Sequence, residues 1–152
     1  MAEIMEVWNY KLYEAAENGS VEDLKLCLAN GANIDNQVNG RTALMFAASG
    51  GHVEVCQLLL ENRCNKDITD WDGWTALMWA ACKGHVEVCR LLLENRCNKD
   101  ITDRDGRTAL HLGAEWGYLQ VTRCLVEQGG ISPLVKTHQE DMDRVYRVEN
   151  HE

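Results

Sequence analysis

Apolar residues recur every three or four positions in the segment GHVEVCRLLLEN, residues 84–95. The apolar set is Val86, Cys89, Leu92 and Leu93. On a helix, Glu87, Arg90 and Glu94 face the opposite side. This spacing predicts a helix with one apolar face, which must be buried against another element.

Two long segments of the chain are almost identical. Residues 51–70 read GHVEVCQLLLENRCNKDITD and residues 84–103 read GHVEVCRLLLENRCNKDITD, so they differ only at Gln57 and Arg90. The offset of 33 residues also relates three glycines of the frames GRTAL, GWTAL and GRTAL: Gly40, Gly73 and Gly106. A short repeat cannot bury its own apolar face, so we expect the repeats to stack and to leave a long concave surface.

Each repeat also carries the signals of a first, shorter helix. Thr75 precedes Ala76 and Leu77 and is a suitable helix N-cap. The small residues Ala80 and Ala81 follow, and they allow a neighbouring helix to approach closely. The pattern therefore predicts a turn and two short helices in every repeat.

This pattern resembles the ankyrin-repeat family. Three segments follow its consensus, NGRTALMFAASGGHVEVCQLLLENRCN, DGWTALMWAACKGHVEVCRLLLENRCN and DGRTALHLGAEWGYLQVTRCLVEQGG, while LYEAAENGSVEDLKLCLANGANIDN, residues 12–36, is similar to a degenerate capping repeat. Together they cover about residues 9–131. The resemblance implies an all-α helix-turn-helix solenoid with β-turn fingers and about four repeats.

The repeat frame divides the chain into five parts. We expect an N-terminal helix with a capping repeat (1–38), three further repeats (39–71, 72–104 and 105–137) and a tail (138–152). The tail contains five acidic and two basic residues and lacks the G-x-T-A-L frame, so we interpret it as a frayed acidic segment.

The chain departs from the family at several positions. Arg63 and Arg96 stand where the family has a helix-stop glycine, so each would be strained if that site is left-handed. The family's proline near the start of the first helix is replaced by alanine in all three repeats. Its histidine remains only as His111, for which the resemblance implies a bond to Thr108. Repeats with methionine at that position must rely more on packing.

Composition narrows the class of protein. The net charge of −9 repels phosphate backbones and anionic lipids, so nucleic acid and membranes are poor candidate partners. No apolar run is long enough to span a membrane, and the start, MAEIMEVWNY, does not read as a secretory signal. We therefore expect a cytoplasmic or nuclear monomer whose seven cysteines are reduced thiols.

Candidate catalytic and metal-binding motifs are sparse. His52 with Cys56, and His85 with Cys89, have the i, i+4 spacing of two zinc ligands, but each pair supplies only half a site. We favour histidines that shape a turn and cysteines that pack in the core. Phosphate-binding, nucleophile-elbow and C-x-x-C motifs do not occur. The prediction is a protein without catalytic activity, metal or cofactor.

The positions at which the repeats differ indicate a binding surface. In the ankyrin family these positions lie on the fingers and first helices, which line the concave face. The predicted partner-binding residues are Arg41, Phe46, Trp71, Trp74, Trp79, Lys83, Arg104, Arg107 and Trp116. Among the tryptophans, we expect Trp71 and Trp74 to be exposed in a turn, Trp79 and Trp116 to face the concave side, and Trp8 to belong to the cap.

Tryptophan and arginine dominate binding hot spots, so the leading hypothesis is a protein–protein interaction module that holds a protein or peptide. Near-identical repeats fit either a natural adaptor or an engineered repeat binder. The alternative is a methyl-lysine reader, because GWTALMWAACK is similar to a tryptophan cage in the ankyrin domains of some histone methyltransferases. Cys82 replaces the cage glutamate. A third hypothesis is nucleotide binding through Trp71 and Lys83.

Overall fold

The computed structural model describes residues 2–128, which form eight helices. The first helix of each pair is α1 (Ala2–Asn18), α3 (Ala43–Gly50), α5 (Ala76–Lys83) or α7 (Ala109–Glu115). The second is α2 (Val21–Ala29), α4 (Val53–Glu61), α6 (Val86–Glu94) or α8 (Leu119–Glu127). Within residues 2–128 the only extended pairing is a single bridge between Val38 and Arg41.

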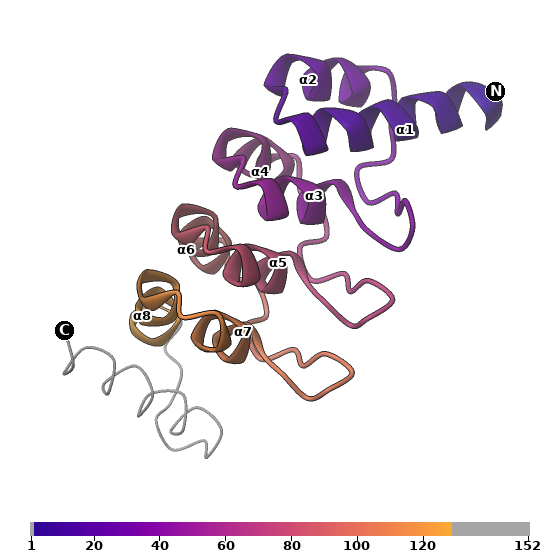
Figure 1. The fold of residues 1–152 in the computed structure, drawn as a ribbon. Helices are drawn as coiled ribbons and strands as arrows, with labels where there is room; N and C mark the ends of the chain where they lie inside the picture. The colour runs from indigo at the N-terminus through magenta and orange to yellow at the C-terminus, as the bar shows by residue number, and fades with distance from the viewer. Residues whose placement is uncertain (1, 129–152) are drawn as a thin grey trace.

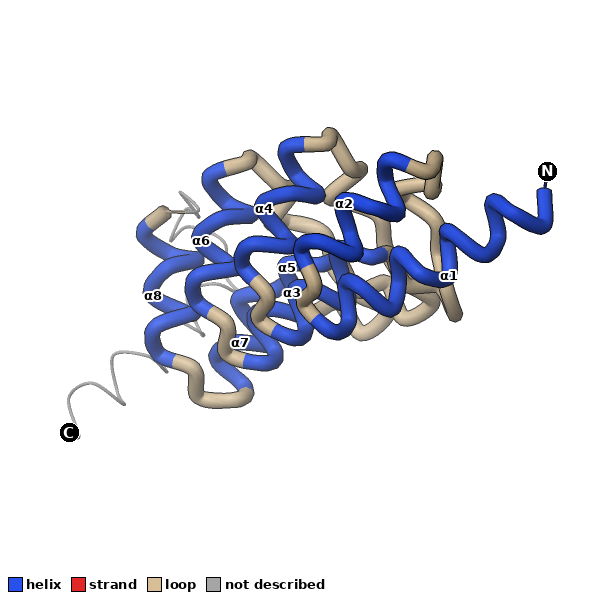
Figure 2. The backbone as a smooth tube through the Cα atoms, turned by 90° about the horizontal axis from the view of Figure 1, so that it is seen from above, coloured by secondary structure: helices blue, strands red, loops and turns tan. Residues whose placement is uncertain are grey.

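The four helix pairs stack in chain order (Figure 1). The first helices contact one another in one row, and the second helices form a parallel row behind them (Figure 2). The connecting segments 31–42, 63–75 and 96–108 project beside the first helices, and we call them the first, second and third fingers. The predicted all-α ankyrin-type solenoid is confirmed, while the exact repeat boundaries stay a prediction and the predicted tail, residues 138–152, lies outside the described residues.

Threonine caps and small side chains produce this packing. The hydroxyls of Thr42, Thr75 and Thr108 accept hydrogen bonds from backbone N–H groups in the first turns of α3, α5 and α7. His111 completes a capping box with Thr108, as the resemblance implies. Buried alanines on the first helices let them approach closely, and buried leucines of the second helices fill the core between the rows.

The histidines of the two His/Cys pairs make structural hydrogen bonds between repeats. His52 donates its Nε2–H to the carbonyl oxygen of Glu17 at 3.0 Å, and His85 donates to the carbonyl of Ser49 at 2.9 Å. Each histidine thereby joins its repeat to the preceding one. Residues 2–128 contain no cluster of histidine, cysteine or acidic residues that could hold a metal ion. In the same range, no helix is long and apolar enough to cross a membrane.

Both arginines at the helix-stop position have a left-handed backbone conformation. Arg63 has a φ of 59° and Arg96 a φ of 60°, after the C-terminal ends of α4 and α6. A side chain with a Cβ is strained in this region, whereas glycine is not. The expected strain at these positions is therefore present.

We expect Arg96→Gly to raise the free energy of unfolding by up to about 1 kcal/mol, because glycine relieves this strain. Urea denaturation followed by circular dichroism measures the change. The matched control is Arg90→Gly inside α6, where glycine should instead lower stability by about 1 kcal/mol. Equal effects of the two substitutions would contradict the assignment of strain to Arg96.

Cysteine burial predicts low thiol reactivity. All seven cysteines are unpaired, and burial raises the pKa of Cys56, Cys64 and Cys97 to about 12. Cys82 and Cys97 are both partly exposed, but burial raises the pKa of Cys82 less than that of Cys97, because Cys82 is less deeply buried.

A disulfide reagent at neutral pH should therefore modify Cys82 first, and the buried thiols should react only on unfolding. Mass spectrometry of peptides after timed labelling locates the adduct. In Cys82→Ser the fast phase should disappear. A fast phase at Cys56 or Cys89 would show that the stack opens readily.

Candidate binding surface

Two buried aspartates hold the second and third fingers in shape. In the second finger, Oδ1 of Asp70 accepts hydrogen bonds from the backbone N–H groups of Asp72 at 3.0 Å and Trp74 at 2.9 Å. In the third finger, Asp103 accepts the equivalent bonds from Asp105 and Arg107, both at 2.9 Å. Each carboxylate thus accepts hydrogen bonds from two backbone N–H groups of a tight loop, which would otherwise need water as their acceptor.

The same carboxylates orient the two central tryptophans. The indole Nε1–H of Trp79 donates to Oδ2 of Asp70 at 3.0 Å, within one repeat. The indole of Trp74 donates to Oδ2 of Asp103 at 3.0 Å, so it links the second finger to the third. The rings lie 4.7 Å apart between centroids and are tilted by 56°. They form one rigid pair.

Arg107 strengthens the Asp103 site. Its Nε lies 3.1 Å from Asp103 Oδ2, and its other nitrogens reach Glu115 at 3.3 Å and Asp105 at 3.5 Å. Burial opposes ionisation of Asp103. It is outweighed by the backbone hydrogen bonds and by the guanidinium, so the pKa of Asp103 lies below its ordinary value. The carboxylate therefore stabilises the fold in its charged form.

Rings and guanidinium groups follow one another along the first helices and fingers. We call this series the aromatic stripe; its members are Tyr10, Tyr13, Phe46, Arg41, Trp79, Trp74 and Arg107. In this order, each member is separated from the next by 5.4, 4.5, 5.9, 4.4, 4.7 and 6.0 Å, measured between ring centroids or from a guanidinium carbon to a ring centroid. The stripe spans all four helix pairs, so it gives one surface of aromatic and cationic character across the stack.

Trp71 lies beside the stripe at the tip of the second finger and is 67% exposed. Its ring covers Gly40 of the first finger, where an added Cβ would lie 2.8 Å from Trp71 Cδ1. Asn39 and Gly40 both have positive φ, as a two-residue hairpin turn requires, and the first finger is one residue shorter than the others. Trp71 has no counterpart in that shorter finger and fills the space above it.

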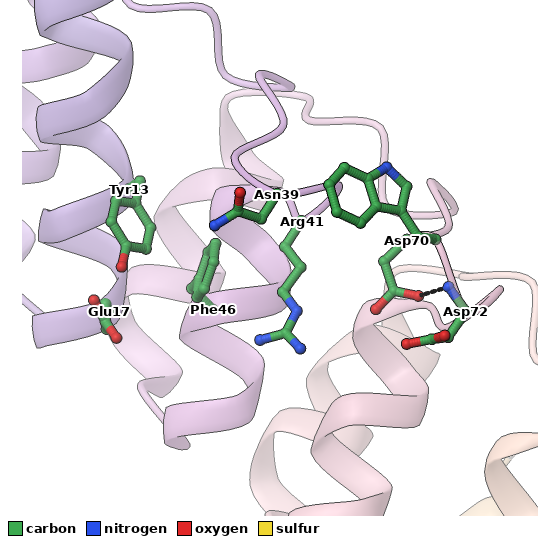
Figure 3. Close-up of a pocket in the computed structure, with 8 residues that line it drawn as sticks. Tyr13, Glu17, Asn39, Arg41, Phe46, Asp70 and Asp72 are labelled. Atoms are coloured by element: carbon green, nitrogen blue, oxygen red, sulfur yellow. Dashed lines mark hydrogen bonds between the residues drawn. The ribbon is translucent and has the colours of Figure 1, made fainter.

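A groove of about 410 Å³ lies between the first two fingers (Figure 3). It is lined by Tyr13, Glu17, Asn39, Arg41, Phe46, Asp70, Trp71 and Asp72. The pKa of Tyr13 lies above its ordinary value, chiefly because the carboxylate of Glu17 lies beside its hydroxyl. In Figure 3 the Arg41 side chain runs between Phe46 and Asp70. The groove thus combines ring faces, one cation and three carboxylates.

Five predicted residues belong to the stripe: Arg41, Phe46, Trp74, Trp79 and Arg107. Trp71 borders them, and Lys83, Arg104 and Trp116 are exposed elsewhere. Trp116 ends α7 and makes no ring contact with the stripe within residues 2–128. Tyr10 and Tyr13 are stripe members that the sequence argument missed, because α1 read only as a cap. Trp8 is half-buried against the core, as a cap residue would be.

The expectation that Trp74 is exposed was wrong. It is half-buried because Asp103 holds its nitrogen and Trp79 covers its ring. The geometry also disfavours the methyl-lysine cage, since the centroids of the two rings lie only 4.7 Å apart. Arg41 already covers Trp79 at 4.4 Å. Trp74 and Trp79 are therefore part of the surface's framework.

A family model for ankyrin repeats, in three copies, matches residues 12–103 and 64–137. The chain is 44% identical over 64 residues to the E3 ubiquitin-protein ligase XBAT33 of Arabidopsis thaliana, covering 41% of this chain and 12% of the ligase. It is 38% identical over 61 residues to osteoclast-stimulating factor 1 of Monopterus albus, covering 40% and 28%.

A further match is human NAD-capped RNA hydrolase NUDT12, 38% identical over 58 residues and covering 37% of this chain and 13% of the hydrolase. This chain therefore spans between an eighth and about a quarter of these relatives. Such partial matches carry no catalytic assignment, and ankyrin repeats are generally not catalytic.

Asp103→Asn should lower the free energy of unfolding by about 1–3 kcal/mol, because it weakens a buried charge-assisted network. The depressed pKa makes this contribution present above the ordinary aspartate pKa of about 3.9 and lost as the pH falls through the folded value. Urea denaturation at several pH values should thus show a steeper acid loss in the wild type than in the variant.

The control for this prediction is Asp105→Asn, because Asp105 bonds the same arginine but its side chain is 77% exposed. Its removal should cost no more than about 1 kcal/mol. If both substitutions had equal effects, Asp103 would not be the anchor of the third finger.

Proposed function

The chain belongs to the ankyrin-repeat family, whose repeats mediate protein–protein interactions, and we propose that its fingers and first helices bind a protein or peptide partner. The binding residues are those of the aromatic stripe together with Trp71. Arg104, Lys83 and Trp116 extend the surface at its edges.

The observation that carries this proposal is the exposure of Trp71 above a stripe of fixed rings. A tryptophan that is 67% exposed leaves a large apolar area in contact with solvent. Its neighbours Trp74 and Trp79 are already held by buried aspartates. Binding therefore requires little ordering of side chains, which favours affinity.

The character of the surface supports a macromolecular partner over a small molecule. The stripe extends across four helix pairs, and the groove beside it is open. The nucleotide hypothesis gains no support, because no contact joins Lys83 to Trp71 in the part of the chain that the structure describes.

Trp71→Ala should abolish partner capture while leaving the fold intact, because the ring is exposed and buries no core residue. Affinity capture from lysate with wild type and variant, after circular dichroism, identifies proteins lost only from the variant. Leu26→Ala on α2 is the matched control, since Leu26 is also an exposed apolar residue but lies in the row of second helices.

Identical capture by wild type and Trp71→Ala would contradict binding on this surface. Loss of capture with Leu26→Ala alone would instead place the interaction on the row of second helices. Trp116→Ala is informative in the same experiment, because it tests how far the surface extends beyond the stripe.

A further inference from the structure

Arg41 and Arg107 occupy the same place in their repeats, but only Arg107 has carboxylate partners. Three carboxylates, at 3.1, 3.3 and 3.5 Å, surround the guanidinium of Arg107. No carboxylate within residues 2–128 forms an ion pair or hydrogen bond with Arg41.

The residues at corresponding positions around the two arginines explain this difference. The backbone N–H of Asp103 donates to the carbonyl oxygen of Arg107, and the N–H of Val38 donates to the carbonyl oxygen of Arg41 in the same way. Val38 therefore stands in the first finger where Asp103 stands in the third. The other two acids that hold Arg107 are Asp105 and Glu115. In the corresponding places two repeats earlier stand Asn39 and Ser49. The three acids that contact Arg107 therefore have no acidic counterparts around Arg41. No change of the Arg41 rotamer could restore these ion pairs.

Ring contacts keep Arg41 in place without using its N–H groups. Its guanidinium carbon lies 4.4 Å from the centroid of Trp79 and 5.9 Å from that of Phe46. A guanidinium has five N–H donors in a planar fork that fits a carboxylate. The side chain lines the groove between the first and second fingers (Figure 3). Its donors are thus positioned for a group supplied from outside.

Three acids line the groove besides Arg41, and none of them forms an ion pair with it. Asp70 accepts three hydrogen bonds and is only 8% exposed. Glu17 lies beside the hydroxyl of Tyr13, whose pKa it raises. Asp72 is exposed at the side of the second finger. These charges disfavour a second anion, so the groove suits one isolated carboxylate better than an acidic run.

We infer that the partner is a peptide segment that places a single aspartate or glutamate side chain on the guanidinium of Arg41, next to an apolar side chain on Trp71. This inference rests on the proposed function, because it specifies what the same surface recognises. Arg41 supplies selectivity for the carboxylate, and the ring of Trp71 supplies apolar contact area.

The test uses random 12-residue peptides displayed at the N-terminus of a phage coat protein and selected on the full chain. In this format the peptide has no free carboxyl terminus, so a shared acid must be a side chain. Selected peptides are synthesised with amidated ends, and their dissociation constants are measured by fluorescence anisotropy. Selected sequences should share one acidic position.

Arg41→Gln should weaken these peptides about 10- to 100-fold, the range expected for a charge-assisted hydrogen bond. Changing the shared peptide acid to its amide should give a similar loss, with little further loss in Arg41→Gln. The control is Arg90→Gln, which makes the same charge change and introduces the residue found naturally at Gln57; affinity should remain within about twofold. Arg41→Lys should give an intermediate loss.

Peptides without a shared acid, or equal affinity for wild type and Arg41→Gln, would overturn the inference. If those peptides still lose affinity with Trp71→Ala, the proposed function stands and only the carboxylate assignment fails. An empty selection, or binding unaffected by either substitution, overturns both. Circular dichroism checks that each variant is folded. If Arg41→Gln does not fold, the loss of affinity is measured with Arg41→Lys instead.

Discussion

The structure depends on the burial of each helix pair against the next. No pair can bury its apolar face alone, so the small residues Ala47 and Ala80 on neighbouring first helices must pack closely while leucines fill the space behind them. This packing fixes the distance between adjacent fingers. Interactions that cross from one finger to the next, such as Trp74 with Asp103, are possible only because that distance is fixed.

The candidate binding surface is a consequence of polar groups buried within this frame. Asp70 and Asp103 satisfy backbone donors of their own loops, and each has a second oxygen that reaches an indole. A buried carboxylate without these partners would be strongly destabilising. The loop and the tryptophan therefore stabilise each other, and the ring is held rigid before any partner arrives.

Periodicity predicted the paired helices and the helix caps, while the resemblance to the ankyrin family implied the stacked fold and the helix-stop position at which the two arginines are strained. These features depend on contacts that recur at a constant offset, such as Thr75 at a helix start or Arg96 after a helix end. The environment of each tryptophan depends on neighbouring repeats and could not be read in the same way. Trp74 looks exposed when its own loop is considered, but its partner Asp103 lies 29 residues away in the next finger.

The comparison of repeats is most informative where a side chain is kept while its surroundings change. Arg41 and Arg107 are the same residue at the same place, yet one is enclosed by acids and the other stacks on a ring. A guanidinium held only by rings retains its hydrogen-bonding capacity, whereas one held by three carboxylates has little left to offer a ligand. The difference in the acids around these two arginines therefore accounts for the recognition role that we propose for Arg41 alone.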